Sequence, residues 1–118
     1  MKRKTLLAIL ALIPLLISCA AQSPHPMEMA SALQSAKTRA DHEALAKHYE
    51  EAAAEMQTKV DEHKQLLAHY ERERYLYAKQ WPAMADHCRN LIRFYEGATQ
   101  ENRQMAELHR AVAANVNS

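Results

Sequence analysis

A ten-residue pattern recurs after 21 residues in this chain and restricts the folds open to it. Residues 41–50 read DHEALAKHYE, residues 62–71 read EHKQLLAHYE, and a looser third copy spans residues 86–96. Twenty-one residues are three heptads, so in a helix slightly underwound to about 3.5 residues per turn the two good copies share one face. The repeat therefore predicts long helices that pack along a heptad seam.

The predicted seam is narrow, because Lys59, Glu73 and Gln80 interrupt its apolar band. The opposite face is charged and typical of a solvated surface. Together these features are typical of an antiparallel helical hairpin or a coiled coil. The seam residues recur every seven positions and have apolar neighbours: His42, Tyr49, Met56, His63, Tyr70, Tyr77 and Met84, beside Leu45, Ala52, Leu66, Ala46, Ala53, Val60 and Leu67.

The composition supports an all-α fold. The 118 residues include one glycine and 22 alanines, which argues against a turn-rich β fold. A chain of this length normally forms one domain. We expect a helical domain over residues 27–114, followed by a frayed tail over residues 115–118.

Local signals predict the start of the first long helix. Thr38 is followed three residues later by Asp41, which is close to a capping box. A helix is therefore expected over residues 38–80. Residues 27–37 are expected as a separate short helix or as a frayed extension of the long one.

The break between the helices is expected at Trp81-Pro82, because proline lacks a backbone donor and disfavours helix at the residue before it. A second helix is then expected over residues 83–113, with a single kinked helix as the alternative. Gly97, in the middle of this second helix, is expected to mark close packing or a bend. The apolar residues that the second helix would present are Met84, Cys88, Leu91, Ile92, Tyr95, Ala98, Met105, Leu108 and Val112.

These boundaries predict helices of unequal length, about 64 Å for residues 38–80 and about 46 Å for residues 83–113. The first helix would then overhang the second by more than three turns. Either residues 27–37 fold back over the overhang, or a second copy of the protein covers it. The predicted interaction surface is this overhang with the stripe that continues from it: His42, Leu45, Tyr49, His63 and Tyr70.

The beginning of the chain is expected to be an export leader, residues 1–18. Three basic residues at positions 2–4 precede an apolar run over residues 6–17 that is too short for an ordinary membrane span. The run ends in Leu16-Ile17-Ser18-Cys19, which resembles the lipobox of bacterial lipoproteins. An ordinary signal peptide with a chance cysteine is the alternative.

The lipoprotein resemblance implies that Cys19 becomes the first residue of the processed chain, linked to diacylglycerol and usually N-acylated. Two or more acyl chains anchor a protein stably to a membrane. In that family an aspartate after the cysteine commonly marks inner-membrane retention, and this chain has Ala20 there. The resemblance thus implies the periplasmic leaflet of the outer membrane, with residues 19–26 as a flexible tether.

Charge argues against a nucleic-acid partner. The leader takes three of the fifteen Lys and Arg residues and leaves twelve against fourteen acidic residues, so the processed chain is slightly acidic. Cys88 is then the remaining cysteine in an oxidising compartment. It is expected as a buried small hydrophobe, an intermolecular disulfide or a soft metal ligand.

Histidine and methionine are unusually frequent in the processed chain, which suggests copper or zinc binding as an alternative function, since thioether and imidazole suit Cu(I) and imidazole also suits zinc. The two repeated histidine pairs are three heptads apart, about 31 Å along a helix, so neither pair can chelate one ion within a helix. Three groupings have usable spacing: His25, Met27 and Met29; Met84, His87 and Cys88; and Met105 with His109.

Enzyme motifs are missing from the sequence: it contains no Gly-x-Ser-x-Gly, His-Glu-x-x-His, glycine-rich phosphate loop or Cys-x-x-Cys. The repeat is similar to that of short uncharacterised bacterial exported proteins, a resemblance that implies a helical fold and no activity. The chain also looks like the murein lipoprotein but lacks its terminal lysine, so covalent attachment to the cell wall is not expected. We expect a non-enzymatic, lipid-anchored protein that contacts itself or another envelope protein and takes no small-molecule substrate.

Overall fold

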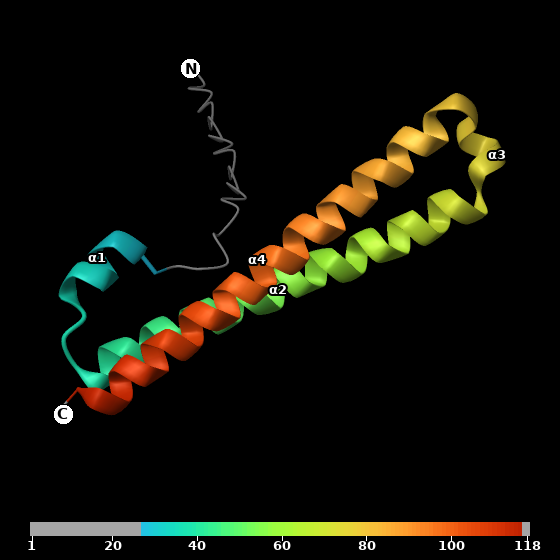
Figure 1. Ribbon diagram of the computed structural model, residues 1–118. Helices are drawn as coiled ribbons and strands as arrows, with labels where there is room; N and C mark the ends of the chain where they lie inside the picture. Colours follow the sequence, from blue (N-terminus) through green and yellow to red (C-terminus); the bar gives the residue numbers. More distant parts are fainter. Residues whose placement is uncertain (1–26, 117–118) are drawn as a thin grey trace, which may run out of the picture.

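The computed structural model describes residues 27–116, and they form an antiparallel hairpin of two long helices (Figure 1). The short helix α1, Met29–Ser35, precedes the first arm, α2, Arg39–Arg72. A reversal made of α3, Arg74–Tyr77, and the 3-10 turn η1, Ala78–Gln80, leads to the second arm, α4, Trp81–Asn115. The described residues contain no strand, and the predicted all-α hairpin with a short N-terminal helix is confirmed.

The capping box predicted at the start of α2 is present. Thr38 Oγ1 accepts a hydrogen bond from the backbone N–H of Asp41 at 3.2 Å. In return, Asp41 Oδ2 accepts from the backbone N–H groups of Lys37 and Thr38, both at 2.9 Å. These bonds favour the carboxylate and lower the pKa of Asp41, the Lys37 N–H contributing most. The cap therefore fixes the residue at which the first arm begins.

The chain reverses earlier than the sequence predicts. The first arm ends at Arg72 and not near Gln80, although the second arm begins as expected beside Pro82, which lies in the first turn of α4 where its missing N–H costs nothing. Between the arms, Ala78 adopts φ 45°, a conformation that favours glycine. The kinked continuous helix is therefore excluded.

The two arms are nearly equal in length, so the predicted overhang is wrong. The arms contain 34 and 35 residues because residues 73–80 form the reversal and α4 continues to Asn115. Their open ends meet: Arg39 Nε donates to the carbonyl oxygen of Ala113 at 3.1 Å. That carbonyl is one of the last in α4 and has no partner within its own helix.

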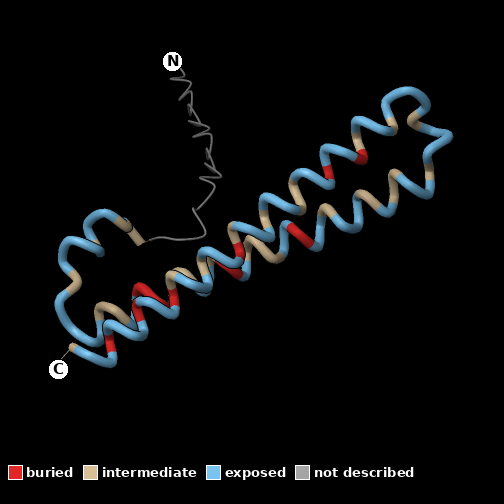
Figure 2. Tube along the Cα trace, in the orientation of Figure 1, coloured by how far each residue is buried: buried red, intermediate tan, exposed pale blue. Residues whose placement is uncertain are grey.

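The core is a seam of mostly small residues between the arms (Figure 2). In α2, Ala46, Ala53 and Val60 are seven residues apart and buried, as the repeat predicts. Small side chains let two helices approach closely, but each buries little apolar surface. The buried residues of the two arms are Leu45, Ala46, His48, Ala53 and Val60 in α2, and Ala85, Cys88, Thr99, Ala106, His109 and Ala113 in α4.

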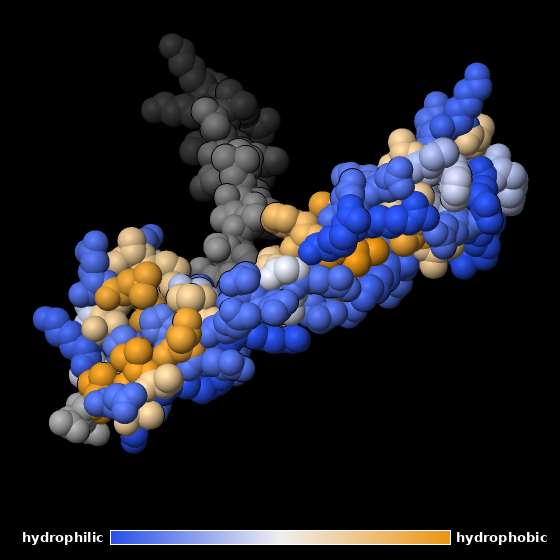
Figure 3. Space-filling model, in the orientation of Figure 1, coloured by the Kyte–Doolittle hydropathy of each residue, from blue (hydrophilic) through white to orange (hydrophobic). Residues whose placement is uncertain are grey.

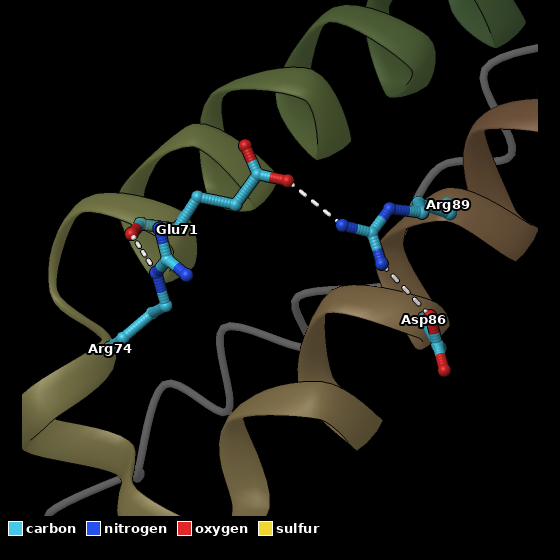
Figure 4. A network of polar contacts seen from close by, with 4 residues as sticks. All are labelled: Glu71, Arg74, Asp86 and Arg89. Atoms are coloured by element: carbon cyan, nitrogen blue, oxygen red, sulfur yellow. Dashed lines mark hydrogen bonds and ion pairs between the residues drawn. The ribbon is translucent and has the colours of Figure 1, made fainter.

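Ion pairs connect the two arms at three places along their length. Arg110 pairs with Glu50, Lys64 pairs with Glu96 at 3.0 Å, and Arg89 pairs with Glu71 at 2.8 Å. Figure 4 shows the pair nearest the reversal, where Arg89 also binds Asp86 at 2.9 Å and Arg74 Nε donates to the Glu71 carbonyl at 3.0 Å. Exposed pairs of this kind contribute little stability each, but together they favour a single register of the arms.

Helix α1 lies against the beginning of α2 (Figure 1). A shallow groove formed there is lined by Met27, Ala44, Lys47, His48 and Glu51. Residues 27–37 therefore fold back along the first arm, which is one of the two arrangements that the sequence predicts. The first arm itself does not overhang the second.

Candidate contact surface

Three of the predicted contact residues lie inside the hairpin. The imidazoles of His42 and His109 stack with ring centroids 5.4 Å apart, and their Nδ1 atoms are 3.2 Å apart. Tyr49 stacks on His109 at 5.5 Å, and Leu45 is 1% exposed. These residues join α2 to the end of α4, so they do not form the free surface that the sequence predicts.

The His42–His109 contact depends on the protonation of both rings. A hydrogen bond between two Nδ1 atoms needs one N–H donor and one lone pair, so it cannot form when both rings are charged. Burial, and secondly the charge of His42, lower the pKa of His109. The neutral form of His109 therefore belongs to the packed hairpin.

The other two predicted contact residues lie near the reversal. His63 stacks on Tyr95 at 5.8 Å and meets the edge of His87 at 6.4 Å. Tyr70 packs edge-on against Tyr77 at 4.9 Å. His63 Nδ1 is buried and has no hydrogen-bond partner among residues 27–116.

An open groove of about 470 Å³ lies between the end of α2 and the start of α4. It brings together the histidine of the repeat and the predicted Met84 grouping, which the sequence placed on separate helices. The lining residues are His63, Leu66, Tyr70, Gln80, Ala83, Met84, His87 and Cys88.

The predicted metal ligands within residues 27–116 lie around the start of α1 and at two places along α4. No three His, Cys, Asp or Glu side chains there are arranged to hold a metal ion. Cys88 is a free, buried thiol, as one interpretation had it, and burial raises its pKa. Met105 is half-buried on α4, and Met27 and Met29 lie around the start of α1. Cys19 and His25 lie outside the described residues.

The exposed apolar surface of α4 was not among the predicted contact residues. Phe94 is 66% exposed and Leu108 60%, and Val112 is exposed as well. Beside them a heptad stripe flanks the seam, with Val112 exposed and the other members half-buried: Met84, Leu91, Ala98, Met105 and Val112. In the sequence this stripe and seam residues such as Cys88 and Tyr95 form one apolar set, although their different heptad positions distinguish the two.

Hydrophobic side chains gather at two places on the face shown in Figure 3, at the end of the rod that carries α1 and midway along the arms. None of the described helices is both long enough and apolar enough to span a bilayer.

Comparisons with family models, curated proteins and solved structures gave no match to this chain.

Proposed function

We propose that this protein is a lipid-anchored component of the bacterial envelope that acts by protein–protein contact and not by catalysis. In this proposal, a lipid on Cys19 holds the hairpin at the periplasmic leaflet of the outer membrane. The hairpin then works as a spacer, adaptor or assembly partner.

The observation that carries the contact function is the exposed apolar surface of α4. A monomeric helix normally turns its large apolar side chains toward a core, and a contiguous exposed patch often marks an interaction site. Phe94 and Leu108 point away from α2 and are mostly exposed, although the seam on the other side of α4 is already filled. A surface of this kind supports binding to another helix.

Two close contacts between histidines and their ring neighbours also support a structural role. His42 is engaged with His109 across the seam, and His69 Nε2 is 2.7 Å from the hydroxyl of Tyr77 at the reversal. In both pairs the polar atoms are directed at each other. These four side chains therefore take part in packing the hairpin.

The support for the anchor is the lipobox-like run that ends at Cys19. Metabolic labelling with a palmitate analogue tests it: the chain should be labelled, and Cys19→Ala should lose both the label and the membrane fraction. An unlabelled native chain would contradict the anchor without affecting the contact function.

Capture of the lipidated protein from envelopes tests the contact function. A specific partner, or a second copy, should remain bound after treatment with a chelator. Loss of every partner on chelation, together with stoichiometric Cu(I) or Zn(II) binding that His87→Ala and Cys88→Ala weaken, would instead favour the alternative of copper or zinc sequestration.

A further inference from the structure

Gly97, the single glycine of the chain, has no role inside the hairpin. It lies near the middle of α4, where glycine weakens a helix relative to alanine. Its φ is not positive, so the backbone does not require glycine. A Cβ atom added there would meet nothing within 4 Å, so packing within the described chain does not require it either. Close approach of another chain would account for it.

The large apolar side chain that is most exposed on α4 lies beside Gly97. Phe94 precedes Gly97 by one helical turn and is 66% exposed, and the small Ala98 follows directly. Because Gly97 has no side chain and Ala98 has only a methyl group, the helix surface beside the exposed Phe94 ring is low, and we call this position the depression. A protrusion and a depression on one surface can fit the same surface of a second molecule.

The charges of α4 lie mainly off this strip. Arg89, Glu96 and Arg110 face the first arm and pair with it. On the neighbouring side of α4, which begins beside the groove at Met84 and His87, one charged residue, Glu101, falls among the uncharged ones. That strip consists of Ala83, Met84, His87, Asn90, Leu91, Phe94, Gly97, Ala98, Glu101, Gln104, Met105, Leu108, Ala111 and Val112.

We propose that this strip binds the same strip of a second copy, with the two α4 helices antiparallel and each Phe94 packed into the depression at Gly97 and Ala98 of the other. A twofold axis near residue 96 sets Phe94 opposite Ala98. The interface is isologous, as in most protein dimers.

The same register pairs the rest of the strip without opposing like charges. It sets Met84 opposite Leu108 and Met105 opposite His87. Glu101 lies opposite Leu91, so the two Glu101 carboxylates are ten residues apart, about 15 Å along the axis.

A parallel, in-register pair would oppose Phe94 to Phe94 and Glu101 to Glu101. The two large Phe94 rings would then collide, and the two Glu101 carboxylates would repel each other within an apolar strip. The surface thus favours the antiparallel arrangement of two copies.

This inference rests on the proposed contact function, since it names the surface and the partner through which contact is made. The test uses the photo-crosslinking residue p-benzoylphenylalanine at Phe94, in the full chain in its own membranes. Illumination should give an adduct of twice the mass, and peptide mapping should place the link within about one turn of Ala98 in the second copy.

The matched control carries the same residue at Tyr75, which is 76% exposed at the reversal and off the strip. It should give no dimer adduct. A link from position 94 to position 94, to residues 1–26 of the same chain, or to lipid would overturn the proposed pairing. A link to a different envelope protein would overturn it as well but leave the contact function supported, and absence of any protein adduct would contradict both.

A second variant separates pairing from folding. Gly97→Leu fills the depression, and it should weaken dimerisation about tenfold or more in sedimentation experiments on the detergent-solubilised chain. Its helix content and unfolding midpoint at low concentration should not fall, because a Cβ atom there meets nothing within 4 Å and leucine favours helix more than glycine does. Unchanged dimerisation in Gly97→Leu would overturn the role of the depression.

Discussion

Replacing Leu45 with alanine should destabilise the hairpin by about 3 kcal/mol. Leu45 is 1% exposed and lies one turn after His42, whose ring stacks on that of His109 in α4. The substitution removes about three carbons from the interior, worth roughly 2.4 kcal/mol at about 0.8 kcal/mol each, and the cavity that remains adds to this cost. Because a domain of this size is stable by roughly 5–13 kcal/mol, the loss would be a large share of the total.

Urea unfolding followed by circular dichroism measures this loss. Leu76→Ala is the matched control, because Leu76 is 62% exposed at the reversal and its truncation should change the free energy of unfolding by less than about 0.5 kcal/mol. If Leu45→Ala is as mild as Leu76→Ala, Leu45 is not covered by α4 and the packing described for the open end of the hairpin is wrong.

Three further predictions concern the ends and the reversal. Because burial lowers the pKa of His109, this histidine is protonated at a higher pH in the unfolded chain than in the folded one. The free energy of unfolding should therefore be complete above about pH 6.5 and decrease as the pH falls below it. Coincident thermal melts at pH 5 and pH 7.5 would contradict this. Ala78→Gly should raise the free energy of unfolding by about 1 kcal/mol, since Ala78 has φ 45°, and a lowered melting temperature would refute the strain. Thr38→Ala should lower the free energy of unfolding by about 1 kcal/mol through loss of the cap, whereas Thr38→Ser should keep most of it in the same thermal melt.

Much of the fold follows from local and periodic signals in the sequence. The three-heptad repeat placed Ala46, Ala53 and Val60 on one face, and all three are buried. The Thr38–Asp41 cap and the beginning of α4 beside Pro82 were also predictable, because each depends on side-chain chemistry within one turn.

The reversal was not predictable in the same way. Residues 73–80 contain no glycine or proline and read as a continuation of the helix. The first arm nevertheless ends at Arg72, and Ala78 adopts a backbone conformation that alanine disfavours. Such a conformation persists only when packing elsewhere determines it, here the packing of the two arms along their whole length.

The error at the reversal carried over to the contact surface. A first helix that continued to residue 80 would leave His42, Leu45 and Tyr49 uncovered, whereas a reversal that starts at residue 73 sets them against α4. On α4, the seam and the half-buried stripe beside it occupy neighbouring heptad positions, for example Ala85 and Met84. Only the register of the arms decides which of the two faces inward.

In the hairpin the two long helices lie side by side over their full length, and the distance between two spin labels at its open end measures this. Labels at Glu43 and Ala114, which line one surface depression at the open end, should show a short distance set by helix axes about 10 Å apart and the reach of the two labels. Dilution with unlabelled protein removes distances between copies, and alanine at Cys19 and Cys88 prevents other labelling. A distance approaching 100 Å, as about 71 residues of continuous helix would give, would contradict the hairpin.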